Sequence, residues 1–261
     1  MAARDLQVLL GELADLATAG TQPHTHAYGS DSEQVADLLL PAGDGDHPVA
    51  VLLHGGFWRA RFTKSTMAAL AVDLAGRGWA SWNVEYRRCG NGGGVPETLD
   101  DVRAAVAALA RARAPLDLNR VVVIGHSAGG QLGLCVADEP LVRAVVCLAG
   151  VCDLASAFAQ SIGESAAVEF MGGGPSERPG AYRLADPLAQ IPAGVPVLLV
   201  HGDADQRVPI EQSRRYAAAA NTGGDAGCEL MELAGVDHFA IIDPRTQAWA
   251  AVAARLETLA L

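Results

Sequence analysis

The stretch RVVVIGHSAGG, residues 120–130, runs from four consecutive β-forming residues into a serine that has small residues on both sides. Gly125, Ala128 and Gly129 allow a tight turn from strand to helix, which would bring the hydroxyl of Ser127 out at the edge of a sheet. The following helix would direct the positive end of its dipole at the same point. This pattern predicts a nucleophile elbow at Ser127. Glycine-rich turns also arise for packing reasons, so the rest of the chain must supply the partners that such a serine needs.

Strand-like and helix-like segments alternate along the chain. The expected strands are 34–41, 48–54, 79–86, 120–125, 143–150, 195–202 and 228–235. The expected helices are about 65–76, 98–113, 128–138, 210–221 and 246–259, preceded by an amphipathic N-terminal helix carried by Leu6, Leu9, Leu10, Leu13 and Leu16. A Gly/Asp turn at 43–46 predicts a hairpin between the first two strands. Several strands are nearly continuous Val, Ile and Leu, which is typical of a parallel sheet covered by helices on both faces. We therefore expect a single α/β domain spanning residues 1–261.

Residues 151–190 interrupt this alternation. Glycine and proline clusters there flank one short helical piece between two expected strands. Ligands of open α/β sheets bind beyond the carboxyl ends of the strands, so this insertion is a candidate cap or lid over a site. An idle surface loop is the alternative.

Charge and composition narrow the class of partner. The formal net charge is −11, and Lys and Arg are scattered, which argues against a nucleic-acid or anionic-membrane surface. No apolar run reaches the roughly 18–20 residues of a membrane helix, and Asp5, Glu12 and Asp15 are untypical of a secretory peptide. The five cysteines form no two-residue-spaced pair, and His24 and His26 have no cysteine or carboxylate cluster beside them. We expect a cytoplasmic protein with reduced thiols, no metal and a small-molecule partner, as a monomer or a homodimer.

Two further segments supply what a nucleophilic serine requires. Asp203 and Asp205 follow the expected strand 195–202, where a carboxylate that orients a base would lie, and His238 follows the expected strand 228–235. The order Ser127, Asp205, His238 is the order used on the α/β-hydrolase fold. A lone histidine or a turn aspartate would each be unremarkable alone. Their joint order and placement predict a catalytic triad, which needs no cofactor.

The segment VLLHGGFWR, residues 51–59, predicts the oxyanion hole. Two glycines directly after a strand let the backbone approach a ligand closely. The N–H groups of Gly56 and Phe57 would then join that of Ala128 in holding a tetrahedral oxyanion. An ordinary glycine turn is the alternative.

The HGGFW stretch, residues 54–58, resembles the His-Gly-Gly-x-Trp motif of kynurenine formamidases (arylformamidases) and related small carboxylesterases. The resemblance to α/β-hydrolases runs from about Tyr28 to the end and includes VEYRR, HGDADQRVP and GVDHF. It implies a mostly parallel sheet of about eight strands, with Asp205 rather than Asp203 as the triad acid. Phe57 departs from the His-Gly-Gly-Gly motif of hormone-sensitive-lipase-like esterases.

Several residues are candidates for contacting a substrate: Gly55, Trp58 and His126. Trp58 either walls an acyl or aryl pocket or packs in the core, since large aromatic side chains are mostly buried. The glycine-rich loop 87–101 either lines the entrance or serves as a connector.

The preferred hypothesis is a cofactor-independent carboxylesterase acting on a small ester through an acyl-enzyme on Ser127. Arylformamidase activity, and a biosynthetic acyl-transfer or cyclisation reaction on the same residues, are alternatives. A different class is a ligand-binding protein built on the same scaffold, because a fold alone does not dictate function.

Overall fold

The computed structural model describes residues 22–191, 193–222 and 227–259, together with positions 8, 11, 12 and 15. Within these residues a single sheet has the order β1-β2-β4-β3-β5-β6-β7-β8. The strands are β1 His24–Ala27, β2 Val35–Leu39, β3 His47–Leu53, β4 Ala80–Val84, β5 Leu116–His126, β6 Val142–Leu148, β7 Val197–Gly202 and β8 Cys228–Leu233. The pairs β1/β2 and β2/β4 are antiparallel, and the other neighbours are parallel. The leucines expected in an N-terminal helix lie outside the described residues.

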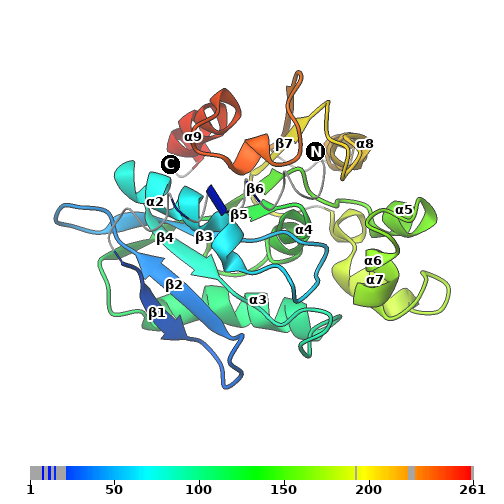
Figure 1. Ribbon diagram of the computed structural model, residues 1–261, viewed down its shortest axis with the longest axis horizontal. Coiled ribbons are helices and arrows are strands. Elements are labelled where there is room, and N and C mark those ends of the chain that lie inside the picture. Colours follow the sequence, from blue (N-terminus) through cyan, green and yellow to red (C-terminus); the bar gives the residue numbers. More distant parts are fainter. Residues whose placement is uncertain are drawn as a thin grey trace.

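Helices cover both faces of the sheet (Figure 1). The helices α2 (Ala68–Gly76) and α9 (Gln247–Leu259) pack on one face, while α3 (Glu97–Ala108), α4 (Ala128–Cys135) and α8 (Glu211–Thr222) pack on the other. Strand β5 shows why its sequence is continuously apolar: Val121 and Val123 enter the core under α3 and α4, whereas Val122 and Ile124 enter the core under α2 and α9. The expectation of a doubly covered, mostly parallel α/β sheet is confirmed.

The pairing of the first strands differs from the expectation. The hairpin predicted between 34–41 and 48–54 is wrong, because β4 lies between β2 and β3 and Trp82 is the register partner of both Leu38 and Val51. Every residue of β4 is buried, as is typical of an inner strand of a sheet that is covered on both faces. The edge strand β1 was not expected from the sequence, since its four residues HTHA are mainly exposed and carry no apolar alternation.

The insertion 151–190 contains more helix than the single piece expected. It forms α5 (Leu154–Ala159), α6 (Ala166–Met171), α7 (Pro179–Ala185) and a 3₁₀ turn at Pro187–Gln190, at the right of Figure 1. The amide of Gln131 in α4 donates a hydrogen bond to the carbonyl of Ala185 at 2.8 Å. Buried side chains from all three helices, among them Leu154 and Phe170, join the core. The insertion is therefore packed onto α4.

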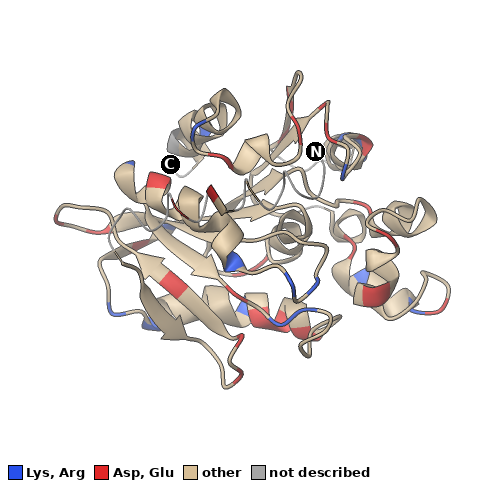
Figure 2. Cartoon of the chain, viewed as in Figure 1, with Lys and Arg blue, Asp and Glu red and all other residues tan. Residues whose placement is uncertain are grey.

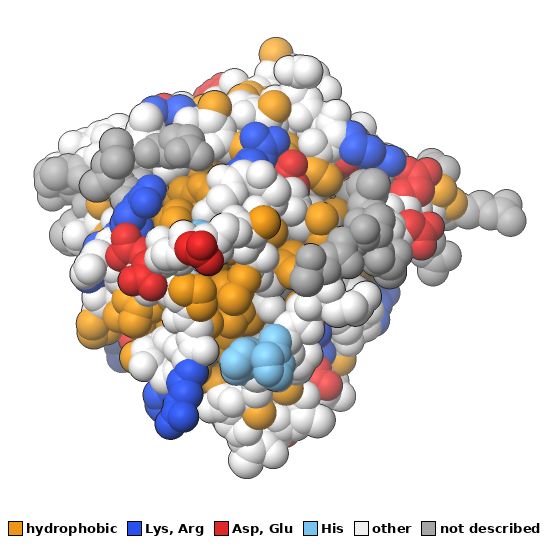
Figure 3. All heavy atoms as spheres, turned by 90° about the vertical axis from the view of Figure 1, so that its left-hand side faces the viewer, with side chains coloured by type: hydrophobic (Ala, Val, Ile, Leu, Met, Phe, Trp, Pro, Cys, Tyr) orange, Lys and Arg blue, Asp and Glu red, His pale blue; other side chains and the backbone are white. Residues whose placement is uncertain are grey.

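Along the cartoon of Figure 2, basic and acidic residues are interspersed over the elements. Figure 3 shows a face where histidine side chains lie among apolar ones. The rings of His24 and His26 are 4.7 Å apart, and that of His26 is 5.3 Å from Trp82. In the described ranges, no three His, Cys, Asp or Glu side chains converge as a metal site would require, and no helix there has the length and apolar composition to cross a bilayer.

Candidate active site

The turn between β5 and α4 consists of Ser127 alone, with φ 56° and ψ −117°. Positive φ is unfavourable for a residue with a Cβ atom, so the surrounding backbone must impose it. Glycine is required on both sides of this turn. A Cβ at Gly125 would lie 2.1 Å from the carbonyl oxygen of Gly129, and a Cβ at Gly129 would lie 2.1 Å from that of Leu53. The sharp bend thus follows from close backbone approach at the end of the strand.

The carboxylate of Asp205 is the best-satisfied acid of the site. Its Oδ2 accepts a hydrogen bond from Nδ1 of His238 at 2.6 Å, and its Oδ1 accepts from the backbone N–H of Arg207 at 2.7 Å and Val208 at 2.9 Å. Burial alone would raise the pKa of Asp205, but the hydrogen bonds from His201 and His238 outweigh it and hold that pKa well below its usual range. Asp205 is therefore ionised, and its bond to His238 requires the proton of the neutral imidazole to be on Nδ1.

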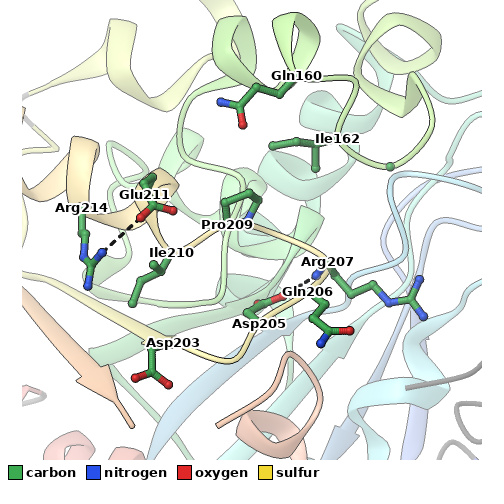
Figure 4. Close-up of a pocket in the computed structure, with 11 residues that line it drawn as sticks. Gln160, Ile162, Asp203, Asp205, Gln206, Arg207, Pro209, Ile210, Glu211 and Arg214 are labelled. Atoms are coloured by element: carbon green, nitrogen blue, oxygen red, sulfur yellow. Dashed lines mark hydrogen bonds and ion pairs between the residues drawn. The ribbon is translucent and has the colours of Figure 1, made fainter. Parts of the chain in front are cut away.

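Asp203 has a different role, although it lies on the same loop (Figure 4). It is exposed, and its Oδ1 accepts a hydrogen bond from the backbone N–H of Gly235 at 2.6 Å. This contact joins the loop after β7 to the turn after β8. Of the two aspartates, the structure brings Asp205 to the imidazole of His238.

His201 is a supporting residue that the sequence analysis missed. It is fully buried at the end of β7, where its Nε2 lies 2.9 Å from the carbonyl oxygen of Val208 and 3.3 Å from Oδ2 of Asp205. The hydroxyl of Ser213 in α8 lies 2.8 Å from its Nδ1. The imidazole therefore fixes the loop on which Asp205 is carried. A histidine within the apolar run VLLVHG is the sequence signal for such a residue.

Ser127 and His238 line one cavity of about 550 Å³. Its other walls come from the loops after β3, β7 and β8 and from the insertion. The remaining lining residues are Gly55, Gly56, Phe57, Arg61, Phe62, Thr66, His126, Glu164, Arg207, Phe239 and Ile242. The cavity is thus apolar on several sides around the serine, with charged groups at Arg61, Glu164 and Arg207.

The loop after β3 approaches the serine closely. A Cβ at Gly55 would lie 2.9 Å from Cβ of Ser127, and one at Gly56, where φ is +120°, would lie 2.4 Å from Cβ of Phe62. Phe57 also has a positive φ, 52°. This conformation brings the main chain, rather than a side chain, next to the nucleophile.

Trp58 lies behind that loop and not on the wall of the cavity. It is 2% exposed, its indole N–H donates to Oε1 of Gln131 at 2.8 Å, and its ring stacks on Phe170 at 4.6 Å. Of the two roles considered for Trp58, the structure shows the packing role, which corrects its assignment as a substrate contact. A polar partner inside the core explains how an indole can be buried there.

A buried charged cluster holds the start of the same loop. The ring of His54 lies 2.8 Å from the Gly55 carbonyl oxygen through Nδ1 and 2.8 Å from the Glu85 carboxylate through Nε2. Arg88, 2% exposed, pairs with both Glu85 and Glu33. Burial lowers the pKa of His54 to about 3. The segment EYRR after β4 therefore places a carboxylate and a guanidinium against the start of the loop after β3.

Tyr86 completes this cluster. Its hydroxyl donates to the carbonyl of His54 at 2.6 Å, and its ring stacks on the His54 ring at a centroid distance of 4.3 Å. The carbonyl and the ring of His54 are thus each held by one neighbour.

A second, open cavity of about 630 Å³ adjoins the first and shares Arg207 with it (Figure 4). Gln160 and Ile162 of the insertion form one side, and the loop after β7 forms the other. The insertion therefore borders both cavities, through Glu164 in the first and through these two residues in the second.

The elbow between β5 and α4, set at the carboxyl edge of a mostly parallel sheet with helices on both faces, defines an α/β-hydrolase. Residues 36–219 match the BD-FAE family model, and the chain belongs to this esterase family.

Known proteins resemble the chain at low identity. Esterase LipC of Mycobacterium tuberculosis is 28% identical over 246 residues, which cover 83% of this chain and 59% of LipC. Esterase Est2 of Thermogutta terrifontis superposes with a TM-score of 0.73 at 21% identity, covering 91% of each chain. A truncated carbohydrate esterase from gut microbiota gives a TM-score of 0.77 at 20% identity, covering 92% of this chain and 97% of that one. The chain thus spans somewhat more than half of LipC, and the solved structures support the fold.

Proposed function

We propose that the protein is a carboxylesterase that cleaves a small ester through an acyl-enzyme on Ser127. One observation carries this proposal: the buried 2.6 Å hydrogen bond between His238 and Asp205, beside the cavity that His238 shares with Ser127 at its positive-φ elbow. The three residues come from three loops at one edge of the sheet. Membership of an esterase family supports the same reaction class.

The proposed chemistry assigns one role to each residue. Ser127 attacks the acyl carbonyl while Nε2 of His238 takes the hydroxyl proton, since Nδ1 is already protonated toward Asp205. The resulting imidazolium is stabilised by the Asp205 carboxylate and returns the proton to the leaving alcohol as the ester bond breaks. Water, deprotonated by His238, then cleaves the acyl-enzyme and releases the acid and the free serine.

Main-chain amides supply the oxyanion hole in this proposal. The N–H groups of Gly56 and Phe57 come from the loop that approaches Ser127, and that of Ala128 lies at the first turn of α4. Each such donor contributes about 3–4 kcal/mol of transition-state stabilisation in sites of this type. The helix dipole adds to the positive potential at the same point.

The walls of the cavity favour a compact acyl group. Phe57, Phe62, Phe239 and Ile242 line it, and segment 151–190 contributes Glu164 to its rim. We infer that the insertion covers the bound substrate. The three phenylalanines also favour aromatic groups, which keeps arylformamidase activity as the second candidate.

The test is a panel of p-nitrophenyl esters of increasing chain length, together with N-formylkynurenine, for the wild type and Ser127→Ala. We expect the short esters to be turned over, and Ser127→Ala to lose at least about 10³-fold in rate while remaining folded. Turnover of N-formylkynurenine far above that of the esters would favour the formamidase, and failure of both would favour acyl transfer or cyclisation.

Labelling of Ser127 by a fluorophosphonate separates enzymes from binding proteins. A stoichiometric adduct on the wild type and none on Ser127→Ala is the expected result. An inert wild type that still binds a ligand tightly would point to the binding-protein alternative.

A further inference from the structure

The residue before the nucleophile makes a contact that the proposed mechanism does not use. Nε2 of His126 lies 2.9 Å from the backbone carbonyl oxygen of His238, across 112 positions of sequence. Because a carbonyl oxygen only accepts hydrogen bonds, the ring proton of His126 must be on Nε2. The side chain next to the nucleophile thus donates to the main chain of the residue that carries the proposed base.

We propose that His126 is a positioning residue that sets the distance between the His238 imidazole and the Ser127 hydroxyl. This inference rests on the proposed function, because it concerns the geometry of the same proton transfer. His126 and Ser127 are consecutive, so a bond from His126 to His238 fixes the base relative to the backbone that carries the nucleophile. The Asp205 contact, by comparison, fixes the ring from the opposite loop.

The ring of His126 also touches the loop on the other side of the serine. Its centroid is 4.6 Å from that of the His238 ring and 6.0 Å from that of Phe239. A Cβ at Gly55 would lie only 3.0 Å from its Nδ1. His126 is 3% exposed, so it fills the space between the oxyanion loop and the loop of His238. The side chain of His126 therefore separates the loop of Gly55 from the loop of His238 beside the proposed nucleophile.

The charge state of His126 suits this role. Burial, reinforced by the neighbouring His238, lowers the pKa of His126 to about 3. The ring is therefore a neutral donor at physiological pH. A cation at this point would oppose the positive charge that His238 acquires during the reaction, whereas a neutral imidazole holds the loop without that repulsion.

The experiment compares His126→Gln with His126→Leu. The side-chain amide of glutamine can donate near the original Nε2, while leucine fills the space and cannot donate. His126→Leu leaves the backbone carbonyl of His238 without its donor. This variant should lower kcat on p-nitrophenyl acetate by about 10–100-fold, with KM changed by less than about threefold. His126→Gln should recover kcat to within about threefold of the wild type.

Three controls keep the comparison interpretable. His26→Leu, a histidine substitution in β1, controls for the loss of an imidazole elsewhere and should leave kcat within about twofold. Urea unfolding of each variant reports folding, and His126→Met replaces the leucine variant if the latter does not fold. The rate of fluorophosphonate labelling reports activation of Ser127 without substrate turnover, and it should fall and recover in parallel with kcat.

Equal losses in the glutamine and leucine variants, or no loss in either, would overturn the positioning role, as would a change confined to KM. Failure of this inference is distinct from failure of the proposed function. A wild type that turns over esters, an inactive Ser127→Ala and a fully active His126→Leu would remove only the role of His126. A wild type without esterase activity would remove the proposed function itself.

Discussion

The two loops that flank Ser127 are fixed in different ways. The proposed oxyanion loop, residues 54–58, is held by a buried carboxylate, because Glu85 contacts the ring of His54 and pairs with Arg88. The base loop, residues 236–239, is held by Asp205 through the imidazole of His238 and by His126 through the backbone. In the first loop the charged side chains stabilise the backbone conformation. In the second loop the charged carboxylate of Asp205 contacts the proposed base.

This difference separates two kinds of consequence. A charge buried among counter-charges contributes to stability only as a set, because removal of one member leaves another without its partner. A carboxylate that orients the imidazole acts on the barrier of the reaction. Substitutions beneath the oxyanion loop should therefore appear mainly in the free energy of unfolding, and those at the base loop mainly in kcat.

The largest expected effect is at the base loop. Asp205→Asn should lower kcat by about 10⁴-fold, because the amide no longer holds the tautomer with the proton on Nδ1. Asp203→Asn is the matched control on the same loop, and its kcat should stay within about tenfold of the wild type, since Asp203 contacts the backbone of Gly235. Steady-state kinetics on one p-nitrophenyl ester measures both. Similar losses of kcat in the two variants would mean that Asp205 is not the acid that orients His238.

The cluster beneath the oxyanion loop should respond in stability. Arg88→Met leaves the buried carboxylate of Glu85 and the partly exposed carboxylate of Glu33 without their cation, and we expect the free energy of unfolding to fall by about 3–5 kcal/mol. Urea denaturation measures it. The control Arg255→Met breaks the exposed pair with Glu229 and should change stability by about 1 kcal/mol or less. A loss at Arg88 no larger than at Arg255 would contradict the structural role of the cluster.

Gly56→Ala tests the oxyanion loop directly. The new Cβ would collide with Phe62 and displace the loop, so kcat should fall by about 10²–10³-fold, the loss expected for one oxyanion donor. Gly43→Ala is a close match, since φ is +112° at Gly43 and +120° at Gly56, but a Cβ at Gly43 would meet nothing within 4 Å. Its backbone strain should leave kcat unchanged. A similar loss of kcat in both variants would count against the proposed hole.

The smallest expected effect, counted for each histidine and each pH unit, is one that the two loops share. Burial lowers the pKa of His54 and of His126 to about 3, so in the folded state both stay neutral at pH values where the unfolded chain, with a histidine pKa near 6.5, binds protons. Stability should therefore fall as the pH drops below about 6.5, with a slope of up to about 1.4 kcal/mol per pH unit for each histidine. Urea unfolding from pH 7.5 to 4.5 measures the slope.

The glutamine variant of His126 supplies the control for that slope. It removes one of the two histidines and should reduce the slope by up to about 1.4 kcal/mol per pH unit. An unchanged slope in His126→Gln would mean that other groups produce the acid sensitivity.

The three proposed catalytic residues could be predicted from local sequence patterns. Ser127, Asp205 and His238 each follow a strand that is recognisable from its own composition, and parallel strands end at the same edge. The prediction of a hairpin between the first two strands was wrong, because a local turn pattern does not determine which strands pair. The strand β4 pairs with both β2 and β3, and a turn at 43–46 carries no information about a strand that comes later in the chain.

Contacts across long sequence separations could not be predicted. The bond from His126 to the carbonyl of His238 spans 112 positions, and nothing in either motif specifies it. The pairing of Arg88 with Glu33 depends on how the segment after β4 meets the residues before β2. The packing of Trp58 against Gln131 likewise depends on α4 lying behind the oxyanion loop. The sequence motifs therefore predict the proposed catalytic residues, whereas the side chains that support them depend on the tertiary fold.

The backbone angles at Ser127 lower the folding stability of the chain in exchange for a hydroxyl at the turn. A residue without a Cβ would relax the φ of 56° that the turn imposes. A chain optimised only to resist unfolding would place glycine at position 127 and gain on the order of 1 kcal/mol. The molecule instead keeps a side chain on this strained backbone, at the point where the proposed reaction needs a hydroxyl to meet an incoming carbonyl.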